Sequence, residues 1–308
     1  MKCVFGIDVG GTTVKIGKFS VEGKLLKKWE IFTNKEDHGK HIVNEIYKSM
    51  VKNNVNFDDV IGYGFGVPGP VVHNHILQCV NLGWKDYDLK SEFSALVDNN
   101  YIIIQNDANV AAVGESFKGA ASGKQDAVMI TLGTGVGGGI ISNSLPVEGA
   151  FGGGGEIGHI VVKHEDGRQC NCGSKGCLET IASATGIKKE YVAMAKELNL
   201  PGKLNINGKV SAKAVFREAK KGDVLSVAVI DRISYYLGYA CHMLSVMTNP
   251  EVIVIGGGVS KAGDFLLSRI DKEFRKYPFI AAQQTQIKLA TLGNDAGMYG
   301  AASLVING

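Results

Sequence analysis

The chain has 308 residues, of which 45% are apolar, and a formal net charge of +3. This length predicts about two domains with ample core, and the small charge with dispersed lysines argues against a nucleic-acid partner. No apolar run reaches the ~18 residues of a membrane helix, and Met1 leads directly into a strand-like segment without a signal peptide. We therefore expect a cytoplasmic protein with no membrane partner.

The first third of the chain predicts a β-meander followed by helices and strands. An apolar run over 2–9 ends in Asp8, and a glycine-threonine turn at 10–13 leads into the segments VKIGKF and LLKKWEIF. This pattern indicates an antiparallel meander. The elements expected next are a helix at 36–53, a strand near 59–67, an irregular segment, a strand at 101–105 and a helix at 108–118. Asp107 is placed to cap the last helix.

The second half repeats the beginning weakly. An apolar strand at 127–132 runs into a glycine-rich turn at 133–138 and another apolar strand, as the first strand and turn do. This suggests two related α/β halves, each with a glycine-rich hairpin turn. The later elements expected are a long helix at 223–247, a buried strand at 251–255, a helix at about 260–275 and a terminal helix from 295.

We place a domain boundary between 110 and 125. The predicted division assigns 1–115 to a small α/β domain and 116–294 to a larger α/β domain. The terminal helix at about 295–308 is expected to return to the first domain, although spacing alone does not predict that return.

A cluster of cysteines with one histidine predicts a zinc site. The ligand candidates are His159, Cys170, Cys172 and Cys177. The cysteines are spaced C-x-C-x4-C, and soft thiolates with one imidazole suit a tetrahedral zinc ion. The alternative is three free thiols clustered by chance, and a disulfide is disfavoured because nothing places the chain in an oxidising compartment. Glu156 and Glu179 flank the array, although a purely structural zinc ion does not need them.

Three glycine-rich turns follow predicted strands, at 10–13, 133–138 and 256–258. Their backbone N–H groups can cradle phosphate, and Asp8 can hold a hydrated magnesium ion. The hydroxyl donors are Thr12, Thr13 and Thr134. Any single turn can also be an ordinary hairpin. A Rossmann site is excluded because neither G-x-G-x-x-G match opens a helix.

Asp107 is the candidate catalytic base. It ends a buried strand and begins a predicted helix, whose N-terminus favours the ionised carboxylate. The alternative is a helix cap with no further role, and Asn106 beside it is commonly only a turn residue.

Seven motifs in order cover nearly the whole chain. They are Asp8-x-Gly-Gly-Thr12, Gly66-Val-Pro-Gly-Pro70, Asn106-Asp107, Leu132-Gly-Thr-Gly-Val-Gly-Gly138, Glu156-Ile-Gly-His159, Cys170-x-Cys-Gly-x-x-Gly-Cys-x-Glu179 and Gly256-Gly-Gly258. Together they resemble the ROK family of repressors, open reading frames and sugar kinases, and most closely its bacterial ATP-dependent glucokinases. The segment Asn81-Leu-Gly-Trp84 is in keeping with this, and Gly154 is a small departure where the family often has alanine.

The resemblance implies a two-lobed actin-like fold of the ribonuclease H type, with a zinc-binding loop and a sugar in the cleft. It implies phosphorylation of the 6-hydroxyl of glucose by ATP and magnesium, with Asp107 as the base. The residues implied to hold the sugar are Gly69, Asn81, Asn106, Asp107, Glu156, His159 and Glu179. The residues implied to hold ATP and magnesium are Asp8, Gly10, Gly11, Thr12, Thr13, Thr134, Gly135, Gly256, Gly257 and Gly258. A β-carbon at Gly135 is then expected to weaken ATP binding far more than sugar binding. A homodimer or homotetramer is also suggested.

Other functions stay open. Kinases of N-acetylmannosamine, N-acetylglucosamine or fructose in the same family share most of these residues. The sequence does not identify the residues that surround the 2-position of the sugar. A sugar-responsive repressor would carry a helix-turn-helix module ahead of the first strand, which here begins at residue 2. A non-catalytic zinc-stabilised binding protein would require an idle Asp107.

Overall fold

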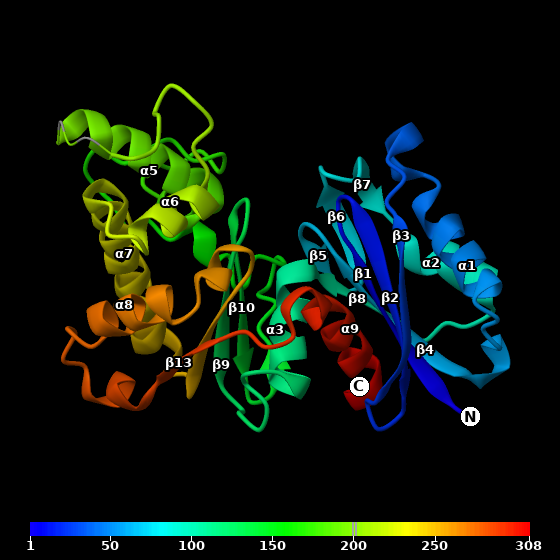
Figure 1. Cartoon of the computed structure of the whole chain (residues 1–308). Coiled ribbons are helices and arrows are strands. Elements are labelled where there is room, and N and C mark those ends of the chain that lie inside the picture. Colours follow the sequence, from blue (N-terminus) through cyan, green and yellow to red (C-terminus); the bar gives the residue numbers. More distant parts are fainter. Residues whose placement is uncertain (199, 201) are drawn as a thin grey trace. The chain divides into compact units, whose positions relative to one another are not determined.

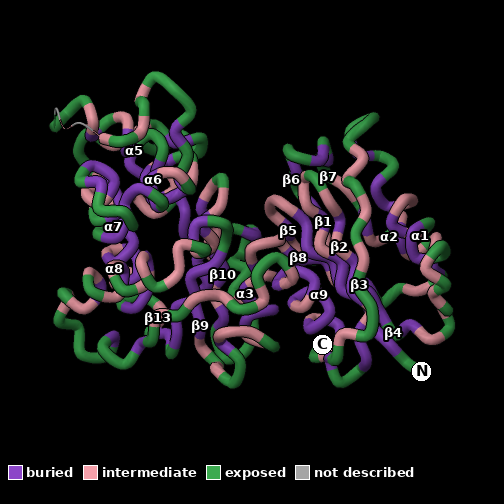
Figure 2. The backbone as a smooth tube through the Cα atoms, viewed as in Figure 1, coloured by how far each residue is buried: buried purple, intermediate pink, exposed green. Residues whose placement is uncertain are grey.

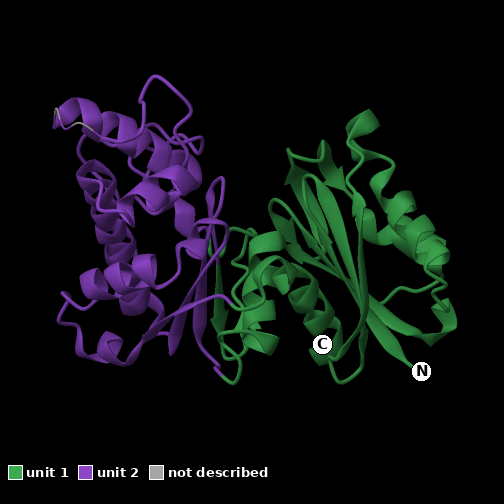
Figure 3. Cartoon of the chain, viewed as in Figure 1, with its two compact units in different colours: residues 1–123, 139–155, 291–308 green, residues 124–138, 156–290 purple. Residues whose placement is uncertain are grey.

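The computed structural model describes residues 1–198, 200 and 202–308, and they form two compact units (Figures 1 and 3). The first unit comprises Met1–Gly123, Gly139–Gly155 and Thr291–Gly308. The second comprises Lys124–Gly138 and Glu156–Ala290. The sequence predicts a division of the chain into a small domain of 1–115 with 295–308 and a larger domain of 116–294. This domain division stays a prediction.

A five-stranded sheet organises the first unit, in the order β3-β2-β1-β4-β8. Its strands are β1 (Cys3–Val9), β2 (Thr13–Ser20), β3 (Leu25–Phe32), β4 (Val60–Val67) and β8 (Ile102–Asn106). The first three strands form an antiparallel meander, and β4 and β8 extend the sheet in parallel from β1. The predicted meander and both later strands are therefore confirmed.

Helices cover both faces of this sheet, so alternate residues of β1 enter different cores. Phe5 and Ile7 pack with α1 (Ile42–Lys52) and α2 (Leu89–Val97), whereas Val4 packs with α9 (Ala296–Asn307). The remaining helix of the unit, α3 (Asp107–Lys118), packs along α9. The buried strands between exposed helix faces are visible in Figure 2.

The segment predicted to be irregular contains a small antiparallel sheet. Its strands are β5 (Val71–Val72), β6 (His75–Cys79) and β7 (Trp84–Tyr87). The prediction was wrong because strands this short carry too few residues to show a period of two. The helix α2 that follows was not predicted, although Asp88 caps it by accepting a hydrogen bond from the amide of Ser91.

The second five-stranded sheet has the order β11-β10-β9-β12-β13. Its strands are β9 (Ala127–Leu132), β10 (Val136–Ser142), β11 (Leu145–Pro146), β12 (Val252–Gly256) and β13 (Gln286–Leu289). Strand by strand this order matches β3-β2-β1-β4-β8, with β12 parallel to both β9 and β13. The repetition predicted from the sequence is confirmed.

The helices of the second unit are α4 (Glu179–Ala182), α5 (Ala184–Glu197), α6 (Ala212–Ala219), α7 (Val224–Thr248) and α8 (Asp264–Phe274). Helix α7 confirms the long helix, which begins at the cap Asp223 and ends at Asn249 in the left-handed conformation. The single helix predicted at 260–275 is instead a 3₁₀ turn and α8, because Gly263 has a φ of 71° between them. In the described part of the chain, 3₁₀ helices lie at Glu36–Gly39, Phe57–Asp59, Ile157–His159, Val259–Ala262, Ile280–Gln284 and Gly293–Asp295. Among the described residues, no helix is both long and apolar enough to cross a bilayer.

Candidate functional site

The parallel strands of the first unit bring the predicted polar residues to one edge of the sheet. Asp8 of β1 pairs with Gly66 of β4, and Val67 of β4 pairs with Asn106 of β8. Because parallel strands end at the same edge, the side chains that follow them gather there. The structure thus places Asp8 and the pair Asn106-Asp107 near one another, with the turn at 68–70 between them.

Asn106 caps helix α3, and this corrects the cap assigned to Asp107. The side-chain oxygen of Asn106 accepts hydrogen bonds from the amides of Ala108 at 2.9 Å and Asn109 at 3.2 Å. Its amide nitrogen donates to the carbonyl of Gly69 at 3.0 Å. Asp107 is the first helical residue, and its Oδ1 accepts from the amide of Ala108 at 2.8 Å. The cap is therefore satisfied without Asp107, which weakens the reading of that carboxylate as a cap alone.

The carboxyl group of Asp8 is enclosed at this edge. A β-carbon on Gly297 of α9 would stand 2.6 Å from its carboxyl carbon, so the helix lies directly against the side chain. Burial raises the pKa of Asp8 to about 6, and the negative charge of Asp107 adds to the shift. The positive charge of Lys15 opposes it.

A pocket of about 250 Å³ lies beside this edge. It is lined by Pro68, Gly69, Pro70, Gln78, Cys79, Val80 and Asn81. The structure thus brings together Gly69 and Asn81, two residues that the family resemblance assigned to the sugar. Asn81 also lies next to the first glycine-rich turn, since its Cβ would be 3.8 Å from a β-carbon on Gly11.

The first glycine-rich turn is held by its own backbone and by Thr33. The amide of Gly10 donates to the carbonyl of Thr13 at 3.0 Å, and the hydroxyl of Thr33 donates to the carbonyl of Gly10 at 2.7 Å. The amide of Thr33 donates to the carbonyl of Thr12 at 2.9 Å. Thr12 is exposed at the tip of this fixed turn.

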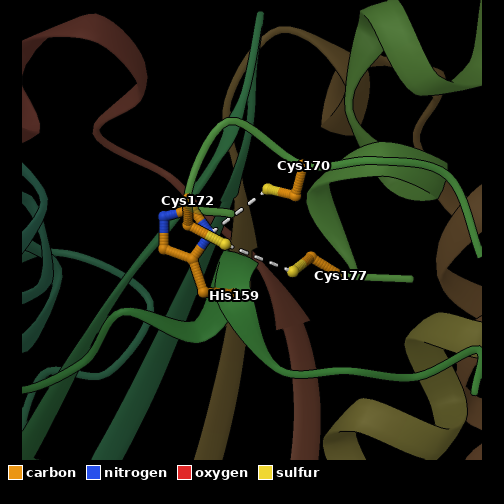
Figure 4. Close-up of side chains that lie close together, drawn as sticks. All are labelled: His159, Cys170, Cys172 and Cys177. Carbon is orange, nitrogen blue, oxygen red and sulfur yellow. Dashed lines mark hydrogen bonds between the residues drawn. The ribbon is translucent and has the colours of Figure 1, made fainter. Parts of the chain in front are cut away.

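The predicted zinc ligands of the second unit converge (Figure 4). One ligand atom from each of His159, Cys170, Cys172 and Cys177 lies within 4.8 Å of the others. Nδ1 of His159 is 3.6 Å from the sulfur of Cys170, and the sulfurs of Cys172 and Cys177 are 3.6 Å apart. In a tetrahedral site with metal–ligand distances of about 2.0–2.3 Å, ligand atoms lie about 3.3–3.8 Å apart. The four residues fit a zinc ion, and the structure confirms that they form one cluster.

Nε2 of His159 faces Glu156, a residue that is predicted to bind the sugar. Nε2 of His159 is 3.9 Å from a carboxylate oxygen of Glu156, which is too long for a direct hydrogen bond. With Nδ1 facing the thiols, Nε2 faces the carboxylate. A hydroxyl group placed between them would have an acceptor and a donor at hand.

The two remaining glycine-rich turns lie at one end of the second sheet. Thr131 of β9 pairs with Gly256 of β12, so the turns that follow these strands are neighbours. Gly257 has a φ of 84°, and a β-carbon there would be 2.5 Å from the carbonyl oxygen of Leu132. Glu179 reaches the same region, because its carboxylate accepts a hydrogen bond from the amide of Val136 at 3.0 Å.

Two polar side chains that support the candidate residues were not predicted: Gln105 is buried and Arg168 is partly buried. Gln105 accepts from the amide of Asn106 at 2.8 Å and donates to Glu148 at 2.5 Å. Arg168 donates to the carbonyl of Thr180 at 2.8 Å and forms an ion pair with Glu190, whose side chain is only 6% exposed. The only sequence signal was a polar residue inside an apolar strand for Gln105, and there was none for Arg168.

Two sheets of the same order, each ending in glycine-rich turns with a carboxylate nearby, define the actin-like ATPase class of α/β proteins. The sequence model of the ROK family matches residues 4–307, and the chain belongs to this family. Its fold is accordingly the actin-like fold that the motifs implied.

Named relatives and one solved structure resemble the chain over nearly its full length. The glucokinase of Halalkalibacterium halodurans is 45% identical over 97% of this chain and 94% of its own. The glucokinase of Thermotoga maritima is 32% identical over 98% and 96%. A ROK family glucokinase from Streptomyces griseus, solved in complex with glucose and AMPPNP, is 32% identical with a TM-score of 0.78, over 99% of this chain and all of that one.

Proposed function

We propose that the protein is a glucokinase that transfers the γ-phosphoryl group of ATP to the 6-hydroxyl of glucose. The observation that carries the proposal is the 45% identity to a glucokinase across 97% of the chain. The Streptomyces griseus relative, solved with glucose and AMPPNP, supports both substrates.

In the first unit, the proposal assigns a catalytic base, sugar ligands and phosphate ligands. Phosphoryl transfer needs an oriented hydroxyl, a proton acceptor and stabilised phosphate charge. In this proposal Asp107 takes the proton of the 6-hydroxyl, while Asn106, Gly69 and Asn81 hold the sugar. The phosphates and magnesium are assigned to Asp8, Gly10, Gly11, Thr12 and Thr13.

The second unit supplies the remaining groups. Sugar hydroxyls both donate and accept, so a pocket for them needs carboxylates and carboxamides in number. We assign Glu156, His159 and Glu179 to those hydroxyls. The phosphates and the nucleotide are assigned to Thr134, Gly135, Gly256, Gly257 and Gly258.

The ions, the assembly and the location complete the proposal. Zinc would be held by His159, Cys170, Cys172 and Cys177, and it would fix the direction of the imidazole. Magnesium would accompany ATP near Asp8 and supply charge neutralisation on the phosphates. We also propose a cytoplasmic enzyme that forms a homodimer or homotetramer.

The decisive test is a substrate panel with ATP and magnesium. We expect kcat/KM to be highest for glucose among glucose, mannose, fructose, N-acetylglucosamine and N-acetylmannosamine. A higher kcat/KM for an N-acetylhexosamine or for fructose would assign the protein to another kinase of the family. The absence of transfer to any of the five sugars would refute the kinase proposal.

The raised pKa of Asp8 predicts both a pH profile and a stability change. The carboxyl has a folded pKa of about 6, above its ordinary 3.8. In the proposal the ionised carboxylate of Asp8 holds the magnesium ion of ATP. The logarithm of kcat/KM for ATP should therefore fall by about one unit for each pH unit below 6.

The effect of pH on folding stability has the opposite direction to its effect on activity. The enclosed carboxyl favours its protonated form, so this favourable contribution is present below pH 3.8 and is lost as the pH rises through 6. Asp8→Asn removes the buried charge, and we expect a higher Tm at pH 8, little change in Tm at pH 4, and loss of most activity. An unchanged Tm at both pH values, with normal activity, would contradict this role.

A further inference from the structure

The carboxylate of Glu179 touches the turn that the proposal assigns to ATP. Its Oε2 accepts the hydrogen bond from the amide of Val136 at 3.0 Å. A β-carbon on Gly135 would stand 2.3 Å from the same oxygen and 3.2 Å from the carboxyl carbon. Glu179, which the proposal assigns to the sugar, thus contacts the 133–138 turn, which the proposal assigns to the nucleotide.

Gly135 provides room for this carboxylate. It is not among the glycines with positive φ, so other residues could adopt its backbone conformation. A side chain at this position would displace the carboxylate of Glu179, whose Oε2 is the nearest atom in its path. The effect expected from the sequence, a loss of ATP binding far greater than the loss of sugar binding, is therefore revised to a loss of both.

The same short segment fixes the turn at a second point. The amide of Ala184 donates to the carbonyl of Gly133 at 2.8 Å, and the amide of Ser183 donates to the carbonyl of Glu179 at 3.3 Å. The turn is therefore held from one side by α4 and the start of α5. A change in the position of Glu179 is transmitted directly to the amide of Val136.

The charge of Glu179 sets the direction of the effect. A carboxylate in the turn to which the proposal assigns the phosphates would repel them, because like charges close together interact strongly outside bulk water. Sugar hydroxyls that donate hydrogen bonds to the carboxylate disperse its charge. Nucleotide should therefore bind more tightly once the sugar is in place.

We propose that Glu179 couples glucose binding to ATP binding, so that each substrate increases the affinity for the other. This inference rests on the proposed function, because the sugar contact of Glu179 and the phosphates at this turn are both part of it. Linkage requires the coupling factor to be the same in both directions, and couplings of this kind are typically about 5–150-fold. The consequence for the enzyme is weak ATP binding in the absence of sugar.

The test measures the Kd of AMPPNP with magnesium by calorimetry, without glucose and at glucose well above its own Kd. We expect at least about fivefold tighter AMPPNP binding with glucose in the wild-type protein. Glu179→Gln keeps an oxygen for the amide of Val136 but removes the charge. It should tighten AMPPNP binding without glucose and bring the ratio close to one. Glu165→Gln removes an exposed charge in the segment that precedes α4 and should keep the wild-type ratio.

The readout without glucose does not depend on sugar binding, so it decides the case even if Glu179→Gln no longer binds glucose. An unchanged AMPPNP Kd in that variant would overturn the coupling role. Loss of all phosphorylation of glucose by the wild-type protein would instead refute the proposed function, whatever the ratio.

A second variant tests the contact itself. Gly135→Ala places a methyl group against the carboxylate and should weaken glucose binding about tenfold or more. The matched change Gly133→Ala meets its nearest atom only at 3.9 Å and should leave the glucose Kd unchanged. A wild-type glucose Kd in Gly135→Ala would show that Glu179 is not held by this turn.

Discussion

Replacing Asp107 with asparagine should reduce kcat by about 10²–10⁴-fold while glucose still binds. The substitution preserves the size of the side chain and an oxygen that can accept from the amide of Ala108, as Oδ1 does at 2.8 Å. Helix α3 keeps its cap, because Asn106 provides it. What is lost is the group that accepts the proton of the 6-hydroxyl. Steady-state kinetics with glucose and ATP, together with a glucose Kd, measure the effect.

An aspartate without a role in the site provides the control. Asp98 is exposed and ends helix α2 in the left-handed conformation, which asparagine also tolerates. Asp98→Asn makes the same chemical change and should leave kcat within a factor of two of the wild type. Near-normal turnover by folded Asp107→Asn protein would exclude this residue as the base. That result would instead favour the alternative interpretation of the chain as a non-catalytic, zinc-stabilised binding protein.

The fold was predictable where apolar runs are long and the turns carry glycine. Strands β1 and β9, each followed by a glycine-rich turn, could be read as a repeat, and the structure confirms it as two sheets of the same order. The small sheet of β5, β6 and β7 was missed because its pairing depends on contacts within a short, mixed segment. Propensity over four residues is too weak to outweigh such contacts.

The candidate site was predictable where its residues are close in sequence. The zinc cluster spans 19 positions from His159 to Cys177, and its ligand spacing alone indicated the chemistry. Which of Asn106 and Asp107 caps α3 was not predictable, since both residue types favour that position. The contact of Glu179 with Val136 joins segments 43 residues apart, and no local pattern records it.

Replacing Cys172 with serine should weaken zinc binding and, through it, glucose binding. The thiol of Cys172 has a pKa lowered to about 6, chiefly by a hydrogen bond from the backbone of Ser174, and it lies 3.6 Å from the sulfur of Cys177. A serine hydroxyl stays protonated near neutral pH and is a poor zinc ligand. Loss of the metal removes the bond that would fix the imidazole of His159, and leaves the weaker 3.6 Å contact of Nδ1 with the sulfur of Cys170.

We expect the KM for glucose to rise about 10–100-fold, with a lower kcat, while AMPPNP binding without glucose changes little. Excess zinc should restore part of the affinity. Cys241→Ala is the control for a general loss of stability, because Cys241 is buried in α7 outside the cluster. It should lower the Tm and keep the glucose KM. The alternative is that zinc only stabilises the loop. In that case Cys172→Ser protein that stays folded without zinc will bind glucose with the wild-type Kd and differ from the wild type only in its Tm.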